Sequence, residues 1–213
     1  MRDYSVVDRF LVGLDVGLRT VFGRPPTTGR PNPIREAEPE PELSQGERRL
    51  AGRLIRIDHA GEVAAQGLYQ GQALTARSPQ VRQQMQRASE EENDHLAWCD
   101  QRLEALRTHR SRLGPLWYGG AYAIGSLAGL IGDRWSLGFV QETERQVVAH
   151  LDDHLHRIPA QDAWSRAVLE QMKADEASHA AAAGRAGAAE LPAPVKGIMR
   201  LASKVMTGTA SWI

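Results

Sequence analysis

The sequences EENDHL, at residues 91–96, and DEASHA, at residues 175–180, each contain a glutamate followed three residues later by a histidine. The glutamate of the first motif lies 30 residues after Glu62, and that of the second lies 32 residues after Glu144. Residues i and i+3 of an α-helix share one face, so each motif can direct a carboxylate and an imidazole at one target. The repeat therefore predicts two helical hairpins that pack into one four-helix bundle.

The repeated side chains form the ligand set of a di-iron or di-manganese carboxylate site. Four buried carboxylates repel one another, but two divalent cations would neutralise their four negative charges. Oxygen and nitrogen ligands without thiolates favour iron or manganese over structural zinc. The alternative, a bundle with ordinary surface glutamates and histidines, does not explain the repeated spacing. We expect these metal ligands: Glu62, Glu92, His95, Glu144, Glu176 and His179.

The acidic residues that precede the two motif glutamates have a predicted supporting role. Glu91 and Asp175 are placed to accept the second N–H of a ligand histidine on a neighbouring helix, which would orient the imidazole ring.

The hydrophobic spacing predicts four long helices after residue 44. Ser44 and Glu47 have the spacing of a capping box before the first helix, and Ser78 opens the second. The third spans about residues 133–158, and the fourth opens near Pro159. Before them we expect an amphipathic helix at residues 1–23 and a linker rich in proline and glutamate at residues 24–45.

Two segments of the domain at residues 46–213 differ from bundle helices. Residues 113–132 carry no charge over a length close to that of a membrane span, but they contain six glycines and one proline. We expect one or two short apolar helices there, buried or lying in a membrane surface. Residues 191–213 predict an amphipathic helix with a basic stripe that suits anionic lipid. A helix docked on the bundle with a solvated face is the alternative.

The composition bounds the function. Lysine plus arginine equals aspartate plus glutamate, 26 each, so nothing indicates a nucleic-acid partner. The one cysteine, Cys99, cannot form an internal disulfide and falls on an apolar stripe, which predicts a core position and a reducing compartment. Asp3, Asp8 and Asp15 interrupt the apolar N-terminus, so we expect neither a signal peptide nor a transit peptide.

Other histidines and one tyrosine are also candidates for site residues. His150 lies two turns beyond Glu144 and can approach the site from the same helix. Tyr69 is expected in the core, with a substrate channel as the alternative. A hydrogen-bonded role is expected for Asp58 and His59. The remaining histidines are expected to be solvated: His109, His154 and His156.

The motif RIDHAGEVAAQGLYQGQ at residues 56–72, the two Glu-x-x-His motifs and the apolar segment PLWYGGAYAIGSLAGLIG at residues 115–132 resemble the demethoxyubiquinone hydroxylase family. The resemblance covers residues 48–213. It implies a ferritin-like four-helix bundle, attached peripherally to the cytoplasmic face of the cell membrane, with two iron ions. The implied reaction hydroxylates the unsubstituted ring carbon of a polyprenylated methoxy-methyl-benzoquinol, using O₂ and an external electron donor. A homo-oligomer or a biosynthetic complex would fit this role.

The resemblance also assigns individual residues. It implies that Glu92 and Glu176 bridge the two iron ions. The family has adjacent glutamates on the third helix, whereas this chain has Glu142 and Glu144; the VVAHL sequence that follows selects Glu144. His150 matches a histidine near the iron, with a catalytic role outside the ligand set. The family's next residue, a tyrosine, is a leucine in this chain.

Three alternatives use the same features differently. An iron-storage or ferroxidase bundle would predict a soluble cage surface, which the apolar segment contradicts. A di-iron peroxidase of the rubrerythrin type usually carries a cysteine-ligated iron domain, for which a single cysteine is too few. A non-catalytic membrane scaffold would use only the amphipathic ends, and it would bind no metal.

Overall fold

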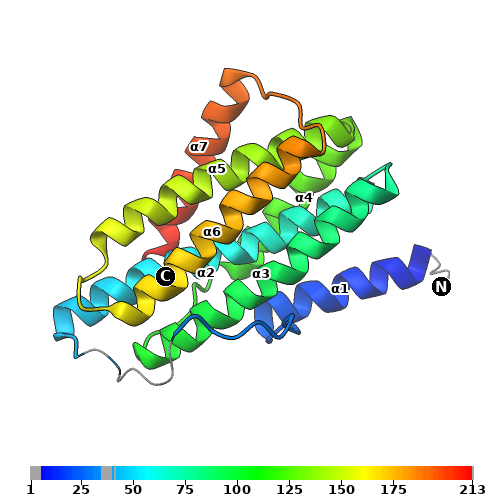
Figure 1. The fold of residues 1–213 in the computed structure, drawn as a ribbon. Coiled ribbons are helices and arrows are strands. Elements are labelled where there is room, and N and C mark those ends of the chain that lie inside the picture. The colour runs from blue at the N-terminus through cyan, green and yellow to red at the C-terminus, as the bar shows by residue number, and fades with distance from the viewer. Residues whose placement is uncertain (1–5, 35–39, 41, 213) are drawn as a thin grey trace.

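The structure, a computed structural model, describes residues 6–34, 40 and 42–212. Within these residues it contains seven α-helices and no β-strand, which confirms the predicted all-α class (Figure 1). Parts of the predicted N-terminal helix and linker, residues 1–5, 35–39 and 41, lie outside the described residues, as does residue 213.

Four helices form a bundle that is consistent with the ferritin-like fold. Helices α2 (Gln45–Thr75) and α3 (Pro79–Ala105) form one hairpin, and α5 (Asp133–Arg157) and α6 (Ala163–Arg185) form the other. The hairpins lie side by side, with α3 against α6 and α2 against α5 (Figure 1).

The helix starts follow the capping residues. The hydroxyl of Ser44 accepts a hydrogen bond from the backbone N–H of Glu47, whose carboxylate accepts one from the backbone N–H of Ser44, so the predicted capping box is confirmed. Helix α6 begins at Ala163 and not near Pro159, because Asp162 caps it: its carboxylate accepts the N–H of Ser165.

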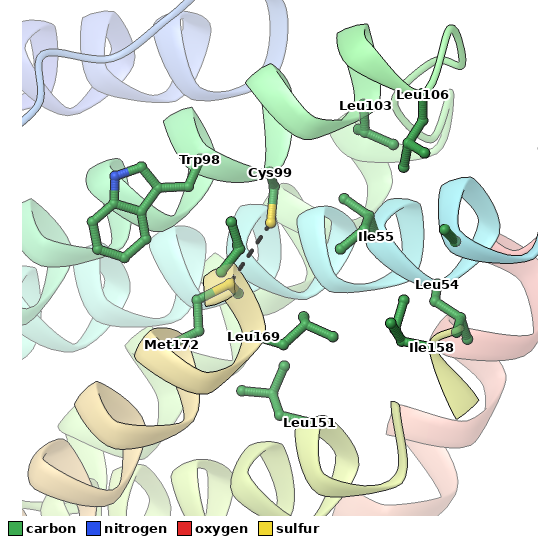
Figure 2. Packing of buried hydrophobic residues seen from close by; sticks show 12 residues of the cluster. Leu54, Ile55, Trp98, Cys99, Leu103, Leu106, Leu151, Ile158, Leu169 and Met172 are labelled. Atoms are coloured by element: carbon green, nitrogen blue, oxygen red, sulfur yellow. Dashed lines mark hydrogen bonds between the residues drawn. The ribbon is translucent and has the colours of Figure 1, made fainter. Parts of the chain in front are cut away.

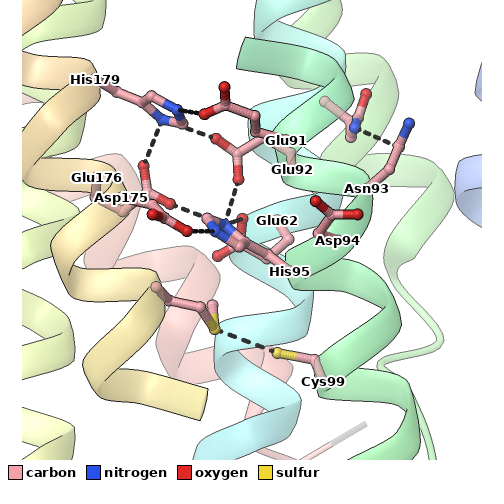
Figure 3. Close-up of polar contacts among 12 residues, drawn as sticks. Glu62, Glu91, Glu92, Asn93, Asp94, His95, Cys99, Asp175, Glu176 and His179 are labelled. Atoms are coloured by element: carbon pink, nitrogen blue, oxygen red, sulfur yellow. Dashed lines mark hydrogen bonds and ion pairs between the residues drawn. The ribbon is translucent and has the colours of Figure 1, made fainter. Parts of the chain in front are cut away.

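An apolar core fills one end of the bundle (Figure 2). Leu54 and Ile55 of α2 pack there against Leu169 and Met172 of α6, and all four side chains are fully buried. Cys99 of α3 is buried among them, with its sulfur 3.8 Å from that of Met172, which confirms its predicted core position. On α3, this core includes Cys99, one helical turn after the histidine of the Glu-x-x-His motif (Figure 3).

The uncharged segment forms one helix, α4 (Gly114–Ile131), which packs along α2. The two backbones approach closely: a Cβ at Gly71 of α2 would overlap the carbonyl oxygen of Tyr122, and one at Gly125 of α4 would overlap that of Leu68. The opposite side exposes large apolar side chains such as Leu127. Among the described helices, none is long and apolar enough to cross a membrane.

Helices α1 (Val6–Phe22) and α7 (Ala193–Ala210) lie outside the bundle. Helix α1 contacts α2 and α4, and α7 contacts α2 and α5. Both expose apolar side chains, including Leu18 on α1 and Leu201 on α7. Residues 24–34, between α1 and α2, have no helix or strand, but they contact α3.

Candidate metal centre

The six predicted ligands converge from the four helices of the bundle. Helix α2 carries one of them, α3 two, α5 one and α6 two, in the order of the sequence motifs: Glu62, Glu92, His95, Glu144, Glu176 and His179. All are buried except the half-buried His179. Glu142 is not part of this cluster, because its carboxylate lies against Lys196 and Gln146.

The ligands fall into two overlapping groups, and Figure 3 shows all of them except Glu144. Around His95, the ligand atoms of Glu62, Glu92 and Glu176 lie within 4.8 Å of one another. Around His179, those of Glu92, Glu176 and Glu144 do the same. Glu92 and Glu176 belong to both groups, which is the position that bridging carboxylates occupy between two ions.

Each histidine presents Nδ1 to the cluster and Nε2 to an acidic residue outside it (Figure 3). Nε2 of His95 lies 2.9 Å from Oδ2 of Asp175 on α6, and Nε2 of His179 lies 2.7 Å from Oε2 of Glu91 on α3. The sequence predicted both partners. An Nε2–H held by a carboxylate leaves Nδ1 free to bind a cation and makes it more basic.

The charges of the cluster suit divalent cations. Burial raises the pKa of Glu62 and of Glu144 well above the usual value, and repulsion by neighbouring carboxylates adds to the shift. Burial alone would lower the pKa of His95, but Glu92 and the other carboxylates outweigh it and raise that pKa. Oε1 of Glu92 is buried and lies 3.4 Å from Nδ1 of His179, without a hydrogen bond of good geometry to a described residue, so it is available as a ligand atom. The residues fit a two-metal centre.

The sequence did not place Tyr69 at this centre. Its ring is fully buried, as expected of a core aromatic, but its hydroxyl donates a hydrogen bond to Oε1 of Glu144. Burial and the nearby carboxylates raise the pKa of Tyr69 well above its usual value, so it remains a donor. The available signal was its position two turns after Glu62 on the same face of α2.

The N-terminal segment also reaches the centre. The backbone N–H and hydroxyl of Thr28 donate to the two carboxylate oxygens of Asp94, next to His95. Arg30 donates to Asp94, pairs with Asp175 at 2.9 Å, and lies over the Trp98 ring. No pattern in the sequence predicted these contacts of Thr28 and Arg30.

A second cluster lies beside the ligands. Nδ1 of His154 is 2.8 Å from Oδ1 of Asp58, and Nε2 of His150 is 3.4 Å from the same atom. The prediction that His154 is solvated is wrong: it is fully buried, because it lies one turn after His150 on the face of α5 that meets α2. His109 and His156 are exposed as predicted.

A cavity of about 400 Å³ leads to the centre between α4 and α7. Apolar residues form most of its wall, including Trp117 and Ile124 of α4 and Met206 of α7. Its inner end is lined by three of the six predicted ligands and by two residues of the second cluster: Glu62, Glu144, Glu176, Asp58 and His150.

Comparison with known proteins shows the family of this chain. Residues 49–210 match the family described as ubiquinone biosynthesis protein COQ7. The chain belongs to this family. A protein of Nitrosococcus oceani named 3-demethoxyubiquinol 3-hydroxylase is 59% identical to this chain over 212 residues. The alignment covers 100% of this chain and 99% of the relative. Proteins of the same name from Variovorax paradoxus and Nitrosomonas eutropha are 56% and 53% identical, each over 97% of this chain and 98% or 99% of the relative.

Family membership confirms the predicted family and enzyme class, a hydroxylase of ubiquinone biosynthesis. The match at residues 49–210 agrees with the resemblance predicted for residues 48–213. The family match leaves out the first 48 residues, but the relative from Nitrosococcus oceani aligns over the whole chain. Thr28 and Arg30 therefore lie in a segment that aligns with this relative.

Proposed function

We propose that the chain hydroxylates the unsubstituted ring carbon of a polyprenylated methoxy-methyl-benzoquinol, demethoxyubiquinol, with O₂. One observation carries the proposal: an apolar cavity of about 400 Å³ ends on three of the six candidate metal ligands. A quinol ring at its inner end would lie against the centre, and the rest of the cavity would hold the first part of an isoprenoid tail. A storage or ferroxidase bundle has no need of such a cavity.

The six converging residues would hold two iron ions, with Glu92 and Glu176 as bridges. When bound, the two ions supply the electrons that reduce O₂ and activate it for insertion into the ring, and an external donor restores them. Glu91 and Asp175 orient the histidines, and Tyr69 fixes Glu144. The apolar wall of the cavity excludes water from the reacting ring.

His150 would act on the substrate. It lies in the cavity wall with about a quarter of its side chain exposed, so its imidazole can contact the ring of a bound quinol. It contributes no ligand to the cluster of six. The His150→Ala variant should therefore retain the two iron ions and lose rate.

Peripheral attachment to the cytoplasmic face of the cell membrane would supply the substrate. Helices α4 and α7 flank the cavity and expose apolar side chains, among them Leu127 and Leu201. Arg200 and Lys204 are exposed on α7, where they can meet anionic headgroups. The quinol would then pass from lipid to the centre between these helices without its tail entering water.

The quinones of cells that lack this chain test the proposal. Such cells should accumulate demethoxyubiquinone, and the wild-type chain should restore ubiquinone. The Glu92→Gln/Glu176→Gln variant should not, whereas Glu90→Gln/Glu170→Gln, which changes exposed glutamates on the same two helices, should. Unchanged quinones in the deficient cells, or restoration by the first variant, would contradict the proposal.

A further inference from the structure

The cluster of Asp58, His150 and His154 is a second group of side chains of the types that bind metal ions. His150 and His154 lie one turn apart on α5, with ring centroids 4.0 Å apart, and Asp58 faces them from α2. One ligand atom from each lies within 4.8 Å of the others. None of the three belongs to the six-residue set.

The spacing of these atoms fits ligands around one cation. Metal–ligand bonds of about 2.0–2.1 Å at tetrahedral or octahedral angles place adjacent ligand atoms roughly 2.9–3.4 Å apart. The distances from Oδ1 of Asp58 are 2.8 Å to Nδ1 of His154 and 3.4 Å to Nε2 of His150.

The contacts between these atoms are not hydrogen bonds of good geometry. Both carboxylate oxygens of Asp58, both ring nitrogens of His154 and Nε2 of His150 are buried, and none makes a hydrogen bond of acceptable geometry with a described residue. Asp58 and His154 are almost completely buried. Buried polar atoms without partners are costly, and a cation would satisfy those that face the cluster.

We propose that Asp58, His150 and His154 bind a third divalent transition-metal ion, separate from the two-metal centre. Two imidazoles and one carboxylate without thiolate suit ferrous iron or zinc, and they leave coordination positions open. Asp58 and His150 line the cavity, so an ion can reach the site and an open position can take an oxygen atom of a molecule bound there. This site does not depend on the proposed reaction.

Binding of Co²⁺ to the metal-free full-length chain tests the site. The Asp58→Asn and His154→Gln variants should each bind one ion fewer than the wild type, or bind it with an affinity reduced by more than the roughly 100-fold upper cost of losing an outer-shell partner. The His156→Ala variant, which removes an exposed histidine from the same helix, should bind as many ions as the wild type. The visible absorption of the remaining ions should not change in Asp58→Asn, which shows that the bundle is intact.

A second background separates this site from the two-metal centre. In the Glu92→Gln/Glu176→Gln variant, Asp58→Asn should again remove one ion, because independent sites lose ions additively. If the two-metal proposal is wrong, the Glu92→Gln/Glu176→Gln variant should bind as many ions as the wild type. Equal binding by the wild type and both the Asp58→Asn and His154→Gln variants would overturn the third site and leave a metal-free histidine–aspartate cluster.

Discussion

Arg30 forms an ion pair with Asp175, with 2.9 Å between Nη1 and Oδ2. The same carboxylate oxygen lies 2.9 Å from Nε2 of His95, so a residue of the N-terminal segment helps to fix a candidate metal ligand. Arg30 also holds Asp94, the residue before that ligand. The segment between α1 and α2 therefore supports the candidate metal centre from outside the bundle.

The Arg30→Gln variant should lose iron faster than the wild type. Without the guanidinium, Asp175 can turn away and release the His95 ring, and outer-shell losses of this kind cost about 10- to 100-fold in metal affinity. The rate at which a ferrous chelator removes iron measures this. Arg24→Gln is the matched control, because the one ion pair of Arg24 with a described residue is with the exposed Glu104, at 3.6 Å. Equal rates for both variants and the wild type would contradict the role of Arg30.

The contact between α2 and α4 should not tolerate a methyl group at Gly71. A Cβ there would overlap the carbonyl oxygen of Tyr122, and overpacking of this kind costs about 1–3 kcal/mol in the free energy of unfolding. Gly119, on α4, has no atom within 4 Å of an added Cβ, so Gly119→Ala should stabilise the helix by about 0.5–1 kcal/mol. Thermal unfolding of both variants checks this, and an unchanged midpoint for Gly71→Ala would show that the helices can separate.

Attachment to lipid should depend on the exposed side of α4. The wild type should sediment with vesicles that contain anionic lipid, and high salt alone should not release it, because burial of apolar surface is not screened. Leu127→Asp/Leu130→Asp should reduce binding, since both side chains are about 60% exposed on α4. Leu74→Asp, on α2, is the control. Complete release of the wild type by salt would show that charge alone holds it.

Asp100 should stabilise the fold at neutral pH but not in acid. Burial alone would raise its pKa, but hydrogen bonds and charges from His59 and Arg110 outweigh burial and lower it. A pKa lowered by folding gives stability that is present above the unfolded value, near 4, and is lost as pH falls through the folded value. Asp100→Asn should therefore cost about 1–3 kcal/mol at pH 7, and the difference from wild type should shrink below about pH 4. A difference that is constant with pH would contradict this.

The features of the fold and of the candidate site that the sequence predicted are those that depend on periodicity within one helix. The four bundle helices and the convergence of Glu62, Glu92 and their counterparts follow from spacings of three to four residues and from the length of a hairpin. The outer partners Glu91 and Asp175 were also predictable, because each adjoins a ligand in the sequence.

Contacts between distant segments were not predictable in this way. Tyr69 meets Glu144 from 75 residues away, and Arg30 meets Asp94 from a proline-rich segment that has no periodic pattern. His154 stands among charged residues that suggest a solvated face, and only its packing against Asp58 shows that it is buried. These positions depend on how the helices pack, which spacing alone does not determine.

Oxygen-isotope labelling of the product tests the central claim most directly. The iron-loaded chain, given a reductant, a demethoxyubiquinol analogue and ¹⁸O₂, should form a product with one added hydroxyl whose oxygen carries the label. The Glu144→Ala variant, which lacks one ligand and one negative charge, should lose iron and turnover together. Label taken from H₂¹⁸O instead of ¹⁸O₂, or wild-type turnover by the Glu144→Ala variant, would contradict the account.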